Sequence, residues 1–134
     1  MTRRFAFAAA AAAALAVLAA PALAHHSFAM FDQRKIMTLD GTVTEFQWTN
    51  PHAFIELDVP GKGHWSIELN SPNNLKRQGW TRTALKRGDH VSLRMNPLRS
   101  GDQGGLFLDV RLPDGRTLDS GLPKNGTPVN VPRV

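Results

Sequence analysis

The sequence contains no cysteine. This absence excludes a disulfide framework, a thiolate metal site and a cysteine nucleophile. The Gly-x-Ser-x-Gly turn of α/β-hydrolases is also missing. The glycine-rich stretch "SGDQGG" at 100–105 is not followed by the Gly-Lys-Ser/Thr of a phosphate-binding loop. We therefore expect a binding module and not an enzyme, and any metal ion would be held by nitrogen, oxygen or thioether ligands.

A single long apolar run is present, at the N-terminus. Arg3 and Arg4 precede the alanine-rich stretch 5–20, Pro21 ends it, and the small residues "ALA" at 22–24 follow. This pattern predicts a cleaved signal peptide over residues 1–24. Cleavage after Ala22 is the alternative site. A transmembrane helix is disfavoured, because the run is short for a bilayer that needs about 20 strongly apolar residues.

The predicted signal also decides the compartment. The two arginines are compatible with a twin-arginine signal, but the general secretory route is favoured. Both routes lead to the periplasm, and no transmembrane span is expected after cleavage. The mature chain would keep 110 of the 134 residues, with 14 Lys and Arg against 11 Asp and Glu. This small excess of positive charge gives no reason to expect a nucleic-acid partner.

The middle of the chain has the alternating pattern of half-buried β-strands. Residues 53–59, "AFIELDV", and 64–69, "HWSIEL", alternate around the turn "PGKG". The preceding stretch, 38–48, changes phase near Gly41, which predicts a bend or a bulge. Residues 90–95 and 106–112 predict two further strands, and a short one is expected at 116–118.

Between these strands the sequence changes to helical signals. Ser71 is a candidate N-cap with Pro72 at the first helical position, and Thr81 and Gly88 would bound a second short helix. This insert is basic. Its positive charges form either a solvated helical face or a surface that binds anions or lipid headgroups. Three strands, a helical insert and two strands predict an all-β fold, a small five-stranded OB-like barrel, over residues 25–119. Residues 120–134 are expected to form a loose tail, and an open sandwich is the alternative fold.

The histidines carry the chemical hypothesis, because neutral imidazole is a common metal ligand. All of them follow the predicted cleavage site: His25, His26, His52, His64 and His90. Cleavage after Ala24 would give His25 a free α-amine, with a pKa of about 7.7–8.0. That amine and its own Nδ1 can chelate one ion, which resembles the histidine brace of secreted copper proteins.

The remaining ligand could come from two places. His26 can contribute together with the peptide nitrogen before it. His52, in "WTNPH", shares the outward face with Phe54 and Glu56 and can supply a further imidazole. Such nitrogen ligands suit copper, with zinc or nickel behind it. A simple hairpin register would also place Glu56 opposite Glu68, a like-charge pair that a cation would relieve. Without a metal, the N-terminal histidines would be solvated and His52 would bond to its neighbours.

Several segments together resemble a family of small exported bacterial proteins, catalogued as a domain of unknown function, family 6152. They are "AHHSFAMFD", "GTVTEFQWTNPHAFIELDV", "SPNNLKRQGWTRTALKRGD" and "LPDGRTL". The resemblance implies a periplasmic protein with a small β-barrel and implies no established activity. It singles out His25, His26 and Ser27, then Trp48, Asn50, Pro51 and His52.

Two functions remain open from the sequence. The first is a periplasmic module that binds a copper-type ion through His25, His26 and His52. Trp48, Asn50 and Phe54 are the candidate ligand- or partner-binding residues beside it. The second is a metal-free interaction module that docks on a membrane complex or another envelope protein or ligand. An OB-like barrel does not distinguish between these functions, because such folds support many activities.

Overall fold

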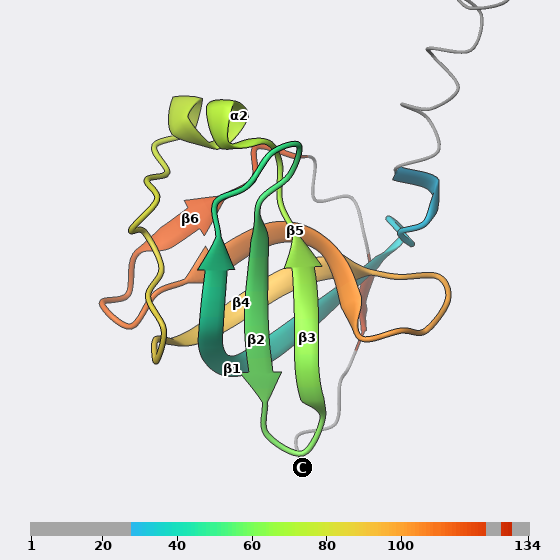
Figure 1. Ribbon diagram of the computed structural model, residues 1–134. Coiled ribbons are helices and arrows are strands. Elements are labelled where there is room, and N and C mark those ends of the chain that lie inside the picture. The colour runs from blue at the N-terminus through green and yellow to red at the C-terminus, as the bar shows by residue number, and fades with distance from the viewer. Residues whose placement is uncertain (1–27, 123–126, 130–134) are drawn as a thin grey trace, which may run out of the picture. The chain divides into compact units, whose positions relative to one another are not determined.

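The computed structural model describes residues 28–122 and 127–129 of the chain (Figure 1). The predicted signal peptide, His25 and His26 lie outside the described residues. The elements, in chain order, are β1 (Lys35–Gln47), β2 (Phe54–Val59), β3 (Gly63–Glu68), α2 (Pro72–Arg77), β4 (His90–Pro97), β5 (Gly104–Arg111), β6 (Thr117–Asp119) and β7 (Thr127–Val129).

Five of these strands close into a barrel. β1 pairs antiparallel with both β2 and β4, and β2 pairs antiparallel with β3. β5 pairs antiparallel with β4 and parallel with β3, which completes the ring. Each strand is apolar on one face, and closure buries all five faces around one core. The predicted fold, all-β with a short helical insert and a five-stranded OB-like barrel, is therefore confirmed.

Strand β1 is long because it serves two neighbours in turn. Residues Met37 to Thr42 pair with β4, and residues from Thr42 onward pair with β2. The register on β2 shifts between Val43 and Glu45. The predicted irregularity is confirmed, and the shift follows Gly41 by a few residues. Gly41 has its own constraint: a Cβ there would lie 2.6 Å from the Asp58 carbonyl oxygen.

The hairpin of β2 and β3 has the alternation that the sequence predicts. Its inward side chains are buried: Ala53, Ile55, Leu57, Val59, Trp65, Ile67 and Leu69. The expected pairing of Glu56 with Glu68 is wrong. Val59 pairs with Gly63 across a three-residue loop, so Glu56 lies opposite Ser66 and Glu68 lies opposite Phe54. The tight loop shifts the register and separates the two glutamates.

The core extends beyond the alternating positions. Val91, Leu93 and Met95 of β4 point inward as predicted, and so do Val110 and Leu112. The predicted inward direction of Leu106 and Leu108 is wrong: Leu106 lies opposite the outward Glu68 and Asn96, and Leu108 is the extra residue of a bulge in β5. Phe107 takes an inward position instead, because the bulge places it opposite the inward Met95, and it is 1% exposed. There the Trp80 ring meets Phe107 edge-on at 5.4 Å between centroids. The insert thus adds Trp80 to the barrel core, which alternation within one strand does not reveal.

The first predicted helix is confirmed and the second is wrong. Ser71 caps α2 by accepting a hydrogen bond from the Asn74 N–H at 3.4 Å, and Pro72 opens the helix. Residues 81–88 form consecutive turns instead of a helix. A helix this short is hard to nucleate. The buried residues that anchor this segment are Trp80, just before it, and Leu85. They are five residues apart and would not lie on one face of a helix.

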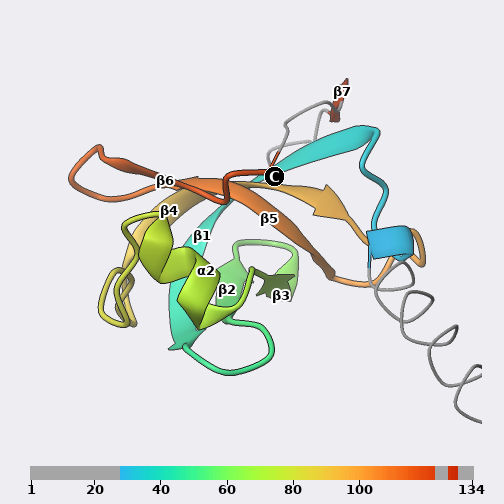
Figure 2. The same ribbon diagram turned by 90° about the horizontal axis from the view of Figure 1, so that it is seen from above.

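The insert and the C-terminal strands complete the arrangement. α2 lies at the end of the barrel where β2 begins and β3 ends, and the segment after it runs down the side where β6 lies (Figures 1 and 2). β6 pairs with β5, and β7, within the predicted tail, pairs parallel with β1. In the described part of the chain, no helix has the length and apolar character needed to cross a bilayer.

Candidate functional site

The predicted site residues that the structure describes gather around the connection between β1 and β2. Trp48, Asn50 and His52 belong to this connection, and Phe54 opens β2. The Thr49 hydroxyl donates to the His52 carbonyl at 2.8 Å, and the Asn50–Pro51 peptide bond is cis. His52 thus lies in the same connection as Trp48 and Asn50, two residues before Phe54, whereas His25 and His26 lie outside the described residues.

The backbone fixes the direction of the His52 side chain. The Ala53 N–H donates to the Asn70 carbonyl at 3.2 Å, and the Leu69 N–H donates to the Ala53 carbonyl at 2.8 Å. These bonds extend the β2–β3 ladder by one pair beyond the regular strands. Because Ala53 is fully buried, the alternation along the strand points His52 outward. His52 therefore lies on the same face as Phe54 and Glu56, as the sequence predicts.

His52 has one ring nitrogen engaged by a carboxylate. Its Nδ1 lies 2.6 Å from Oε1 of Glu68, and the two side chains are 37% and 21% exposed. The contact is an ion pair when the imidazole is protonated, and beside a neutral ring a carboxylate favours the tautomer with the proton on Nδ1. Nε2 then holds the lone pair of the neutral ring. Within the described residues Nε2 has no hydrogen-bond partner, so it is available to a ligand.

His64 has the opposite situation, because both of its ring nitrogens are engaged. Nε2 lies 2.7 Å from Glu56 Oε2, and Nδ1 lies 3.4 Å from Asp58 Oδ1. The Ser66 hydroxyl donates to the other oxygen of Glu56 at 2.9 Å. The hydrogen bond to Glu56 is the main cause that raises the pKa of His64. When protonated, the imidazole donates to both carboxylates and leaves no lone pair for a metal.

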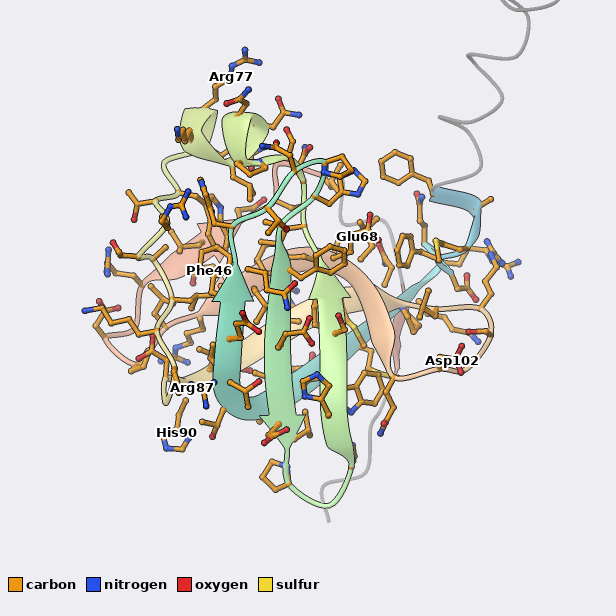
Figure 3. All side chains as sticks on the ribbon, in the orientation of Figure 1. Phe46, Glu68, Arg77, Arg87, His90 and Asp102 are labelled. Carbon is orange, nitrogen blue, oxygen red and sulfur yellow. The ribbon has the colours of Figure 1, made fainter. Side chains whose placement is uncertain are left out.

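The outward face of the β2–β3 hairpin therefore contains two histidine–carboxylate groups of different kinds; Glu68 of the first group is labelled in Figure 3. One leaves a nitrogen free at His52, and the other uses both nitrogens of His64. His90 lies elsewhere, where its Nδ1 is 2.9 Å from the Thr42 hydroxyl. Among the described residues, no three His, Asp or Glu side chains are arranged to hold a metal ion by themselves. A metal at His52 would need ligands from outside these residues.

Aromatic side chains lie close to His52 in sequence, at the end of β1, in the connection after it and at the start of β2. Trp48 meets Phe46 edge-on at 5.6 Å between ring centroids. Both are partly buried against the core. Phe54, also half-buried, lies opposite Glu68 across the β2–β3 ladder, and Asn50 is exposed. Asn50 offers an accessible amide.

Sequence reasoning missed Glu68 as the partner of His52. A signal was present, because Glu68 ends the strand that follows His52 and has the same outward parity. Using it required the true hairpin register, in which Phe54 lies opposite Glu68. The register with Glu56 opposite Glu68 led to the wrong pairing.

Three comparisons relate the chain to known proteins. A family model described as "Family of unknown function (DUF6152)" matches residues 11–110. No curated protein matches the sequence. A crystal structure of TiaS in complex with an isoleucine tRNA and ATP is similar over 57% of this chain at 20% identity, with a TM-score of 0.44. The matched region spans 18% of that chain, and a likeness this low carries no functional argument.

Proposed function

The chain belongs to DUF6152, a family of unknown function, and we propose that it is an exported module that binds a copper-type ion at its mature N-terminus. The ligands would be the α-amine and Nδ1 of His25 and Nε2 of His52. His26 would contribute directly or through the peptide nitrogen that precedes it. The module would store or deliver the ion in the periplasm.

The contact between His52 and Glu68 carries this proposal. Histidines that bind metals usually donate their other ring N–H to a carboxylate, a carbonyl or water. This contact fixes the tautomer, aims the free nitrogen and raises its basicity. The 2.6 Å contact between Nδ1 and Glu68 would give His52 the first two of these properties, a fixed tautomer and an aimed nitrogen. His64, on the same hairpin, does not have them.

The chemistry of the available ligands favours copper. The sequence has no cysteine, so the thiolates common in structural zinc sites are absent. An amine and imidazoles bind copper more strongly than zinc or nickel at similar geometry. The amine contributes because its pKa of about 7.7–8.0 lets it lose its proton near neutral pH at little cost. Binding should therefore release protons.

Copper titration of the exported, cleaved protein tests the proposal, followed by calorimetry in two buffers to count released protons. We expect Glu68→Gln to weaken Cu(II) binding about 10–100-fold, as changes to such supporting carboxylates do. His52→Ala should weaken it at least as much. His64→Ala is the matched control, because it removes an imidazole from the same hairpin whose nitrogens are both engaged.

A second comparison examines the N-terminal ligand. One extra residue before His25 moves the free amine away from the His25 ring and should abolish tight binding. The proposal fails if the extended and the cleaved proteins bind Cu(II) equally. It also fails if His64→Ala weakens binding as much as His52→Ala does.

The half-buried aromatic residues favour a second function, a metal-free docking module. Trp48 and Phe54 present rings beside the exposed Asn50, which suits contact with an envelope protein. In this case a partner captured from envelope extracts would be retained in the presence of a chelator. Trp48→Ala would release it, and His52→Ala would not.

A further inference from the structure

The segment 70–88 is unusual in its charge. It contains five cations, Lys76, Arg77, Arg82, Lys86 and Arg87, and no Asp or Glu. All five side chains are exposed. Within the described residues, which include every Asp and Glu of the chain, none of the five forms an ion pair. We call these residues the cationic segment.

Buried anchors hold the cationic segment in place. Leu75, Trp80 and Leu85 are at most 3% exposed, and the Trp80 indole N–H donates to the Asp119 carbonyl at 3.0 Å. The nearest following carboxylate, that of Asp89, accepts the Lys86 backbone N–H at 2.9 Å and so closes a turn. With the apolar residues turned inward, the cations between them point to solvent. Arg77 and Arg87 mark the two ends of this side in Figure 3.

The composition of the segment limits the partners that it suits. Protein interfaces centre on exposed aromatic or aliphatic anchors. Among the described residues, the exposed large apolar side chains are Phe28 and Met30, which lie outside this segment. Single-stranded nucleic acids require aromatic rings for stacking, and Trp80 is buried. What remains is dispersed positive charge, rich in the arginines that bind phosphate with two hydrogen bonds.

We propose that the cationic segment docks the protein on a bilayer that contains anionic phospholipids. The five unpaired cations would contact the headgroup phosphates, and the anchored loop would stay at the surface. This inference concerns a surface separate from His52 and Glu68. It needs no metal, so it stands or fails independently of copper binding.

Vesicle co-sedimentation of the cleaved protein with a chelator present tests the proposal. We expect binding to vesicles of phosphatidylglycerol and phosphatidylcholine and none to phosphatidylcholine alone. The triple variant Arg77→Gln, Arg82→Gln, Arg87→Gln should weaken binding about 100-fold, at about fivefold for each removed charge. Moderate salt should also weaken it, because the Debye length falls to about 10 Å at 0.1 M.

A matched control removes three arginines elsewhere: Arg34→Gln, Arg99→Gln, Arg116→Gln. These residues are also exposed, but each forms an ion pair with Asp32 or Asp114, so circular dichroism and a urea unfolding curve establish that each variant keeps the native fold before binding is compared. The control should retain most of the binding. Equal losses of vesicle binding in the two triple variants would mean that binding depends only on the net charge of the protein, which would overturn the proposal. Binding to polyglutamate without binding to vesicles would also overturn it, in favour of an acidic protein partner.

Discussion

Gly105 lies where the barrel closes, and its replacement gives a sharp test of the fold. It pairs with Ile67 of β3 on one side and with Pro97 of β4 on the other. A Cβ at this position would lie 2.6 Å from the Asn96 carbonyl oxygen and 2.3 Å from the Met95 sulfur. The Met95 side chain can move aside because it is flexible. The Asn96 carbonyl belongs to the ladder and cannot move without breaking the closure.

Gly105→Ala should therefore destabilise the protein. Overpacking of a well-packed site costs about 1–3 kcal/mol, and here the colliding atom is backbone, which favours the upper half of that range. Alanine also lowers the conformational entropy of the unfolded chain relative to glycine, which offsets about 0.4–1 kcal/mol of this destabilisation. The net loss should be about 2 kcal/mol, or a fall in Tm of about 10 °C for a domain of this size.

Gly104→Ala is the matched control, because the same substitution is made one residue away on the same strand. Its Cβ would lie 2.9 Å from Leu98 Cδ1, the end of a flexible side chain, and 3.0 Å from the Ser66 carbonyl oxygen. We expect a loss below about 1 kcal/mol after the same entropic gain. Urea unfolding of both variants with a common m-value gives the two free energies. A Gly105→Ala variant as stable as Gly104→Ala, or more stable, would refute the closed seam.

Two further predictions concern charged groups. The pKa of His64 is raised, first by its hydrogen bond to Glu56. The protonated His64 side chain therefore stabilises the fold fully at any pH below the pKa that histidine has in the unfolded chain, about 6.5. The effect is lost as pH rises through the folded pKa. The Tm difference between the native protein and His64→Gln should thus be largest in mild acid and vanish in alkali, and a difference that grows with pH would contradict this. Asp109→Asn should lower stability by about 1–2 kcal/mol, measured by urea unfolding, because the 8% exposed Asp109 carboxylate accepts two bonds from the 44% exposed Arg94. An unchanged midpoint would show that this ion pair adds nothing.

Local patterns were sufficient for much of the fold. Alternation over 53–59 and 64–69 correctly assigned the inward side chains, because adjacent strand residues point to opposite faces. Ser71 and Pro72 correctly placed α2, because capping depends on residues within one turn. The order of strands and helix predicted the OB-like barrel. The signal peptide, the export and the copper site stay predictions.

Long-range contacts decided what the patterns could not. Residues 81–88 have helical composition, yet Trp80 and Leu85 are drawn into the core separately, and turns result. The parallel pairing of β3 with β5 joins strands separated by the whole insert. No local signal contains it.

For the candidate site, the sequence alone determined that His52 and His64 begin adjacent strands and point outward. It could not determine which of them keeps a free nitrogen. That depends on the three-residue loop between Val59 and Gly63, which sets the register and gives Glu68 to His52 and Glu56 to His64. Side-chain direction follows from backbone alternation within one strand, whereas side-chain partners follow from how two strands are aligned. Only the folded barrel fixes that alignment.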